Sequence, residues 1–154
     1  MRRKDREVTD PREIAAILEK CDTVRIALND NGYPYIVPVC FGEDIRNGVL
    51  SLYFHCAAEG KKLDLIKKDP RAGFEADTSR TLVTDDARGF CTMRYESVIG
   101  TGRIFFVPES DRLNGLKILM RHYHDGEFSF DTAAVPRTEV LRLEVGSITA
   151  KRNI

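Results

Sequence analysis

The sequence predicts a mainly β fold of the α+β class, in which antiparallel strands form a barrel-like sheet with helices at its edges. Six runs have the composition of β-strands, and most of them follow one another through short turn signals, as in hairpins. These runs cover residues 23–28, 33–41, 49–55, 71–77, 90–107 and 139–149. Runs of antiparallel strands with only a few helices favour such a barrel.

The first helix and the first hairpin have clear local signals. Asp10-Pro11 is typical of a helix start, because a capping side chain precedes a proline at the first helical position. Apolar residues then recur with helical spacing up to about Cys21. The run at 29–32, Asn-Asp-Asn-Gly, predicts a hairpin turn. Pro34 and Pro38 place the strand that follows at a sheet edge or at a bulge.

Similar local signals predict two further helices and several turns in the rest of the chain. Helices are expected at 60–68 and 108–123, and Gly100 and Gly102 suggest bends within the long strand at 90–107. Glycine, proline or polar runs indicate further turns and loops at 46–48, 69–70, 81–89 and 124–137. Without an internal repeat or a linker, residues 1–154 are expected to form one domain.

Composition excludes several classes of protein. The 154 residues include 24 Lys and Arg and 24 Asp and Glu, so no net field attracts nucleic acid or an acidic membrane. The charged N-terminus is followed by no apolar segment of the kind found in signal peptides. No stretch approaches the roughly 18 apolar residues of a membrane span. We therefore expect a cytoplasmic protein with neither a nucleic-acid nor a membrane partner.

The four cysteines favour neither a zinc site nor a thioredoxin-like site. Cys21, Cys40, Cys56 and Cys91 are far apart in the sequence, whereas both kinds of site use closely spaced pairs. In a reducing compartment they are expected to be reduced and largely buried thiols. No metal site is predicted.

Lys61 and Lys62 stand in the first turn of the helix expected at 60–68. The positive end of the helix dipole lies there, so two cations are unfavourable unless they are solvated or bind an anion. Backbone amides together with two ammonium groups would form a phosphate site. Two exposed, solvated lysines are the alternative.

The three histidines differ in their surroundings. His55 lies at a strand end beside this helix, where it would either contact a ligand or bind a backbone carbonyl. His122 and His124 are two residues apart at the end of a helix, so they do not face the same way. Both are interpreted as surface residues.

The run Arg94-Tyr95-Glu96-Ser97 interrupts an otherwise apolar strand. Alternation places Arg94 and Glu96 on one face of the sheet and Tyr95 and Ser97 on the other. The second pair would line a ligand site or simply face solvent. No catalytic triad is recognisable from local spacing.

The order of these features resembles the pyridoxamine 5′-phosphate oxidase-related, FMN-binding split-barrel family, in particular its nitroimidazole-resistance (Nim-type) reductase-like branch. The resemblance rests on five motifs in the family's order, which cover nearly the whole chain. They are MRRKDREVTD, PYIVPVCF, LYFHCAAEGKKLDLIKKDPRAGFEAD, CTMRYESVIGTGR and ITAKRN. The resemblance implies a six-stranded antiparallel split barrel that works as a homodimer, with FMN in each of two interface grooves.

The resemblance also implies roles for particular residues. The backbone of Val37, Pro38, Val39 and Cys40 would run along the flavin ring. Phe54, His55 and Cys56, at the end of a neighbouring strand, would contact the ring and the ribityl chain, and Lys61 and Lys62 would hold the phosphate. Ser97 and Tyr95, on a third strand, would reach the flavin of the partner subunit. His55 is the candidate for a polar contact beside the ring and for a proton donor.

Some positions depart from the family pattern, and other functions remain open. Cys40 stands where a small polar residue is usual, and Ala150 replaces a common glycine.

The expected activity is that of an FMN-dependent oxidoreductase that reduces a nitro-aromatic compound or another small oxidant. The alternative is a split barrel that binds flavin or haem without turnover. Haem would require His55, His122 or His124 as a ligand.

Overall fold

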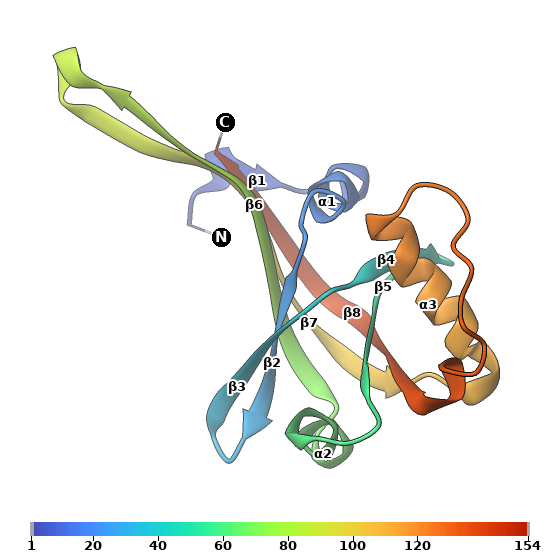
Figure 1. The fold of residues 1–154 in the computed structure, drawn as a ribbon. Coiled ribbons are helices and arrows are strands. Elements are labelled where there is room, and N and C mark those ends of the chain that lie inside the picture. The colour runs from blue at the N-terminus through green and yellow to red at the C-terminus, as the bar shows by residue number, and fades with distance from the viewer. Residues whose placement is uncertain (1, 154) are drawn as a thin grey trace.

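The structure, a computed structural model, describes residues 2–153, and within them the chain forms three α-helices and eight β-strands (Figure 1). The strands are β1 Glu7–Val8, β2 Val24–Asp30, β3 Tyr33–Val39, β4 Gly42–Arg46, β5 Val49–Ala57, β6 Arg71–Asp85, β7 Phe90–Phe106 and β8 Thr138–Asn153. The helices are α1 Pro11–Leu18, α2 Lys61–Lys68 and α3 Glu109–Tyr123, with short 3-10 helices η1 Lys4–Arg6, η2 Asp86–Arg88 and η3 Val135–Arg137. Met1, which opens the first of the five motifs, and Ile154 lie outside the described residues.

The strands form one antiparallel sheet in the order β3-β2-β6-β7-β8-β5-β4, with β1 added to β8. The two end strands of this order, β3 and β4, follow each other in the chain and are joined through Cys40 and Phe41. The sheet therefore curls round without closing by hydrogen bonds between its ends. This is the mainly β, split-barrel architecture that the sequence predicts.

The six predicted strands correspond to β2, β3, β5, β6, β7 and β8. β3 is an edge strand, as its two prolines indicate. A register shift in the pairing of β7 with β8 falls between Thr101 and Gly102, where the glycines suggested a bend. The short strands β1 and β4 were not predicted.

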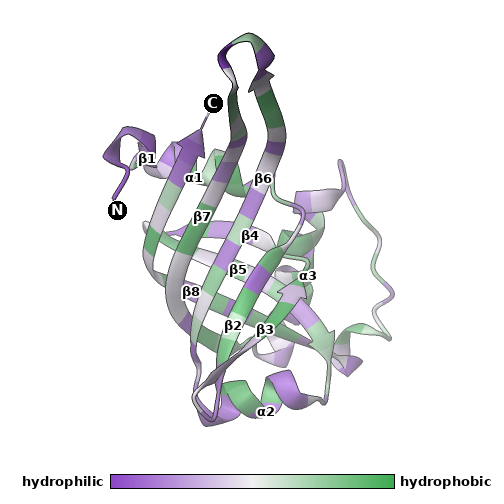
Figure 2. Cartoon of the chain, turned by 90° about the vertical axis from the view of Figure 1, so that its left-hand side faces the viewer, coloured by the Kyte–Doolittle hydropathy of each residue, from purple (hydrophilic) through white to green (hydrophobic). Residues whose placement is uncertain are grey.

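The predicted loop at 81–89 is wrong over most of its length. β6 continues to Asp85 and remains paired with β7 until Asp85 faces Phe90, so only the η2 turn is irregular. The polar composition suggested a loop, but it is also compatible with this part of the β6–β7 hairpin, because no other strand flanks it. β2 pairs with β6 only as far as Glu75, and β8 pairs with β7 only as far as Tyr95. We call residues 79–94 the arm; it projects from the barrel in Figures 1 and 2.

The apolar core fills the inside of the curved sheet. Its fully buried side chains include Ile26, Leu52, Phe54, Leu141 and Leu143. α1 and α2 contribute buried residues to this same core, and they cover its opposite ends in Figure 1. Asp10 caps α1 by accepting a hydrogen bond from the Arg12 amide at 2.8 Å, as its sequence predicts.

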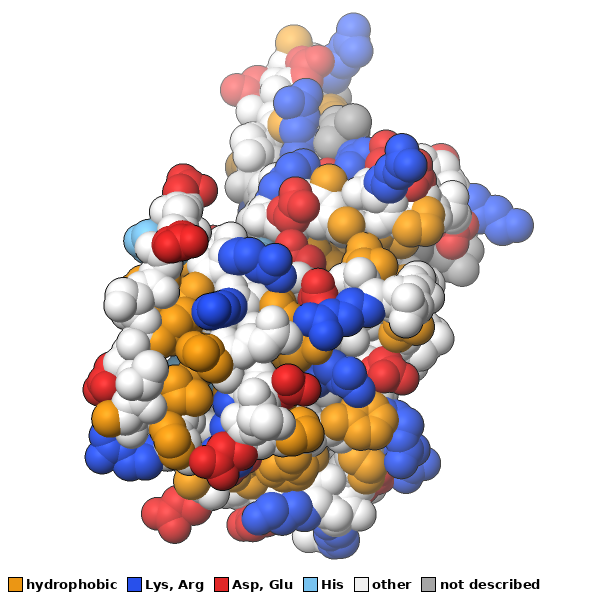
Figure 3. Space-filling model, turned by 90° about the vertical axis from the view of Figure 1, so that its right-hand side faces the viewer, with side chains coloured by type: hydrophobic (Ala, Val, Ile, Leu, Met, Phe, Trp, Pro, Cys, Tyr) orange, Lys and Arg blue, Asp and Glu red, His pale blue; other side chains and the backbone are white. Residues whose placement is uncertain are grey.

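α3 packs on the outside of β4, β5 and β8 around a second, smaller apolar cluster. Figure 3 shows this side of the molecule, on which basic and acidic side chains are interspersed with hydrophobic ones. Among the helices of residues 2–153, none is long and apolar enough to cross a membrane.

Candidate functional site

The start of α2 is open to an anion. β5 enters this helix through Gly60, whose φ of +135° lies in a region that is essentially restricted to glycine. A side chain there would meet nothing within 4 Å, so glycine is needed for the turn rather than for a close approach. No side chain caps the helix, which leaves its first amides available to a ligand.

The two lysines of the predicted phosphate site have different surroundings. The Lys61 Nζ atom lies 2.5 Å from Asp30 Oδ2 and 5.1 Å from the centre of the Tyr35 ring, so Lys61 connects α2 to the β2–β3 hairpin. Lys62 is half-buried and has no ion-pair partner among residues 2–153. Its charge acts on the end of β5, where it lowers the pKa of His55 and opposes the effect of burial on Cys56. Lys62 is therefore the lysine free to bind an anion.

The end of β5 presents one exposed and one half-buried polar side chain on opposite faces. His55 points to the outer face, opposite Val140 of β8. Partial desolvation of its ring, followed by the nearby Lys62 charge, lowers the pKa of His55. The imidazole is therefore neutral at pH 7.

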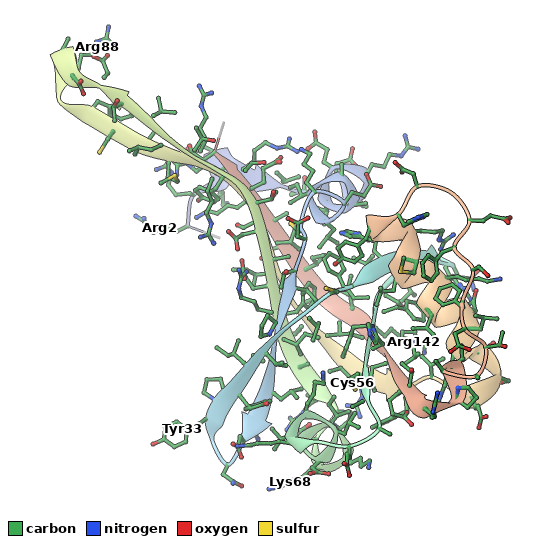
Figure 4. The ribbon with its side chains drawn as sticks, in the orientation of Figure 1. Arg2, Tyr33, Cys56, Lys68, Arg88 and Arg142 are labelled. Carbon is green, nitrogen blue, oxygen red and sulfur yellow. The ribbon has the colours of Figure 1, made fainter. Side chains whose placement is uncertain are left out.

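Cys56 and Phe54 lie on the inner face of β5. Phe54 is fully buried in the core, so only its backbone can meet a ligand. Cys56 packs against the core, and burial raises its pKa. Its thiol is therefore protonated at pH 7, which argues against a nucleophilic role. Figure 4 shows Cys56 near the end of β5 that leads into α2.

β3 offers mainly its backbone to a ligand. The side chains of Val37 and Val39 pack against the core, while Pro38 and Cys40 are exposed on the other face. As an edge strand, β3 has a row of backbone groups with no paired strand on one side within the described sheet. The family resemblance predicts that backbone groups of this strand contact the flavin ring.

A pair of hydrogen bonds to the Tyr123 hydroxyl braces the junction between β3 and β4, and sequence reasoning missed it. The Phe41 amide donates a hydrogen bond to the Tyr123 hydroxyl at 2.9 Å, and that hydroxyl donates to the Asp22 carbonyl at 2.8 Å. Burial raises the pKa of Tyr123 to about 12. The backbone beside Cys40 is therefore fixed by the last residue of α3, about 80 positions away in the sequence.

The interpretation of His122 as a surface residue is wrong. Its side chain is only 4% exposed, and its ring lies between two acceptors. Nδ1 is 2.8 Å from Glu43 Oε2, and Nε2 is 2.8 Å from the Cys21 carbonyl oxygen. No local signal could have revealed this, because α3 meets β4 only in the folded chain. His124 is exposed, as predicted.

The expectation that the cysteines are largely buried is also wrong. All four are free thiols, but only Cys21 is buried; Cys56 is half-buried, and Cys40 and Cys91 are exposed. Cys40 and Cys91 lie at the outward positions of a sheet edge and of the arm, where cysteine does not imply burial.

Tyr95 and Ser97 lie far from the other predicted residues within one chain. His55 pairs with Val140 of β8, whereas Ser97 pairs with Lys151 of the same strand. The two positions are 11 residues apart along β8, which corresponds to about 35 Å of strand at ~3.3 Å per residue. One chain therefore brings together β3, the end of β5 and α2, but does not add Tyr95 and Ser97 to them.

The alternation predicted around Ser97 is confirmed for Glu96. This carboxylate is buried on the inner face, where it binds Lys20 at 2.8 Å and Arg152 at 2.6 Å. Its pKa remains lowered, because the two hydrogen-bonded cations outweigh the effect of burial. Ser97 lies on the opposite, outer face of β7 and is half-buried.

The fold and this site define a class of protein: a split barrel with an exposed sheet edge next to an uncapped, lysine-bearing helix start. Residues 10–152 match the family model of pyridoxamine 5′-phosphate oxidase. The chain therefore belongs to the pyridoxamine 5′-phosphate oxidase family. A search among curated protein sequences found no match.

Several solved structures share the fold. A candidate 5-nitroimidazole antibiotic resistance protein from Bacteroides thetaiotaomicron superposes with a TM-score of 0.82 at 27% identity, covering 94% of this chain and 85% of that chain. The FAD and haem binding protein from Mycobacterium smegmatis gives 0.81 at 18% identity, covering 96% and 73%. The flavocytochrome Anf3 from Azotobacter vinelandii gives 0.80 at 18% identity, covering 100% and 72%. The two comparisons at 18% identity show the fold alone.

Proposed function

We propose that the protein is an FMN-dependent oxidoreductase of the cytoplasm, which acts as a homodimer and reduces a 5-nitroimidazole-like nitro-aromatic compound or another small oxidant. Electrons would come from NAD(P)H or from a reduced partner. The observation that carries the proposal is the uncapped start of α2, where Lys62, which has no ion-pair partner in the described part of the chain, lies beside His55 and near the β3 edge. A helix start suited to a phosphate and a strand edge suited to a planar ring lie side by side there.

The residues present fit FMN. The α2 amides and Lys62 would hold the phosphate, the backbone of Val37 to Cys40 would follow the ring, and His55 would contribute a neutral polar contact. Tyr95 and Ser97, which are remote within one chain, would come from the second subunit. Bound FMN supplies the redox chemistry, so the chain needs only to hold it and leave room for the substrate.

The relative from Bacteroides thetaiotaomicron supports the choice of substrate class. It shares the fold over most of both chains, and its 27% identity to this chain is higher than that of the other two proteins compared. Its description refers to 5-nitroimidazole resistance. The haem alternative has fewer candidate ligands than the sequence suggested. Both ring nitrogens of His122 are engaged inside the protein, which leaves His55 and His124.

An absorbance spectrum of the purified protein, with FMN titrated into any colourless sample, tests the proposal. Flavin bands that NADH or NADPH bleaches, with reoxidation by a nitroimidazole, are the expected result. Flavin bands that no donor bleaches would indicate a binding protein without turnover. A Soret band would indicate haem, and no affinity for either group would contradict the proposed function.

Replacing His55 by glutamine is expected to weaken FMN binding only about fivefold. The ring is neutral at pH 7, and a neutral hydrogen bond contributes about 1 kcal/mol net. Fluorescence titration of FMN measures the change, and His124→Gln, at an exposed site after α3, is the control. A loss of more than about a hundredfold, or no change at all, would contradict the assigned contact.

A further inference from the structure

The arm carries apolar side chains that the rest of the chain does not cover. Leu82 and Met93 face each other across the ribbon and share one face, on which they are 61% and 44% exposed. Phe90 is also exposed at the tip. Figure 2 shows hydrophobic segments on both strands of the arm. Because an isolated two-stranded ribbon is only marginally stable in water, this face requires another surface.

A complementary surface lies at the opposite end of the sheet. A wide-open, shallow cavity of about 710 Å³ lies on the outer face beside the β2–β3 hairpin; most of its lining is small or apolar, such as Ala27, Pro34, Gly73 and Gly102, and Asp69, Arg71 and Arg103 also line it. Tyr33 borders it and is 81% exposed. Figure 4 shows Tyr33 pointing away from the barrel, far from Arg88 at the arm tip. The arm therefore cannot cover this cavity in its own chain.

Two-fold symmetry would bring the two surfaces together, and this step rests on the proposed function. If Ser97 reaches the partner's flavin, the outer face of β7 lies against the α2 end of the partner. Tyr95 and Met93 follow Ser97 on that face, about 7 and 13 Å further along at ~3.3 Å per residue. The arm then extends beyond the flavin groove towards the partner's β2–β3 hairpin.

Two arginines of the arm have ion-pair partners in their own chain, while Arg94 lies on the face opposite Leu82 and Met93. Arg80 is paired with Asp77, and Arg88 lies 3.4 Å from Asp85, so these ionic groups are compensated within the ribbon. The face that carries Leu82 and Met93 can therefore be buried without leaving these charges unpaired.

We propose that the arm of each subunit seats its Leu82 and Met93 face in the cavity beside Tyr33 of a second copy of the chain. The contact is isologous, so each subunit gives one arm and receives one. The arm then closes the outer end of the partner's flavin groove, and its apolar residues form part of the wall that the substrate meets.

Cross-linking tests where the arm lies. Cys91 is exposed on the same face of the arm as Met93, two residues away. Because Cys40 is exposed as well, every cross-linking variant also carries Cys40→Ser. In a Tyr33→Cys variant, a short thiol-specific bifunctional maleimide is expected to join Cys91 to the introduced thiol of the other subunit and give a covalent dimer. Tyr33→Cys combined with Cys91→Ser is the control and should remain uncross-linked. A dimeric protein that gives no such product would overturn the proposal.

Charge on the arm tests whether the contact supports the dimer. Sedimentation of the unchanged protein is expected to give twice the chain mass of 17.5 kDa. Leu82→Asp with Met93→Asp should raise the dimer dissociation constant at least about tenfold, because the contact would bury two charges. Thr81→Asp with Thr92→Asp, on the opposite face, is the matched control. Equal association of both variants would overturn the proposal, whereas a cross-linked dimer without FMN affinity would contradict the proposed function instead.

Discussion

Replacing Lys61 and Lys62 together by alanine is expected to weaken FMN binding by at least about a hundredfold, enough to lose the cofactor during purification. A hydrogen bond to a charged group contributes about 1.5–3 kcal/mol, and 1.4 kcal/mol corresponds to a factor of ten. Fluorescence titration with FMN measures the loss. Riboflavin, which lacks the phosphate, should bind the variant and the unchanged protein equally.

The single variants should differ, because the two lysines differ in their partners. Lys62 is free of ion pairs in the described chain and directs its charge towards His55 and Cys56. We expect Lys62→Ala to account for a loss of about 10- to 100-fold. Lys61 must leave Asp30 to reach a phosphate, so Lys61→Ala should cost less.

The last turn of the same helix provides a matched control. Lys67→Ala with Lys68→Ala removes the same charge from α2 but at the end away from the proposed phosphate site. This variant should retain its FMN affinity within about twofold. The phosphate assignment would fail if both double variants lost equal affinity, or if riboflavin binding fell as much as FMN binding.

Local sequence signals predicted the parts of the fold that depend on local physics. The Asp10 cap, the glycines of the hairpin turns and the prolines of β3 act within a few residues of their own positions. The length of β6 could not be read in this way. Thr81, Thr84 and Asp85 are polar, and only the pairing of this segment with β7, outside the barrel, makes it a strand.

In the candidate site too, features that depend on neighbouring residues were predicted, whereas those that depend on the tertiary fold were not. The start of α2 was identified because Gly60 and the two lysines are adjacent in the sequence. The ion-pair partner of Lys61 was not identified, since Asp30 lies far away in the sequence, in the β2–β3 hairpin. His122 appeared to be a surface residue because it lies at a helix end, two residues from His124, with which it does not share a face. Its acceptors, from β4 and from the end of the α1 segment, become neighbours only through the tertiary fold.

Replacing His122 by alanine is expected to lower the free energy of unfolding by about 2–4 kcal/mol. The change removes two hydrogen bonds, one of them to a carboxylate, and leaves Glu43 largely buried without its partner. Denaturant unfolding measures the difference. His124→Ala, two residues further on at an exposed position, should change stability by less than about 0.5 kcal/mol.

The stability difference between the unchanged protein and His122→Ala should also depend on pH. Both ring nitrogens face acceptors, and only the protonated imidazole can donate from both. Burial opposes protonation, but the Glu43 carboxylate and the Cys21 carbonyl outweigh it and raise the pKa of His122 above 6.5. A group with a raised folded pKa stabilises the fold fully below its unfolded pKa and loses that contribution as pH rises through the folded value.

The difference in unfolding free energy between the two proteins should therefore be largest below about pH 6.5, the ordinary pKa of histidine, and shrink as pH rises through the raised folded pKa. His55 and His124 are present in both proteins, so their titration largely cancels in the comparison. A difference that stays constant over this range would mean that His122 is neutral in the fold and that one of its two contacts is not a hydrogen bond. Because the same end of α3 fixes the Phe41 amide beside Cys40, exchange of that amide with solvent should quicken in step with the loss of stability.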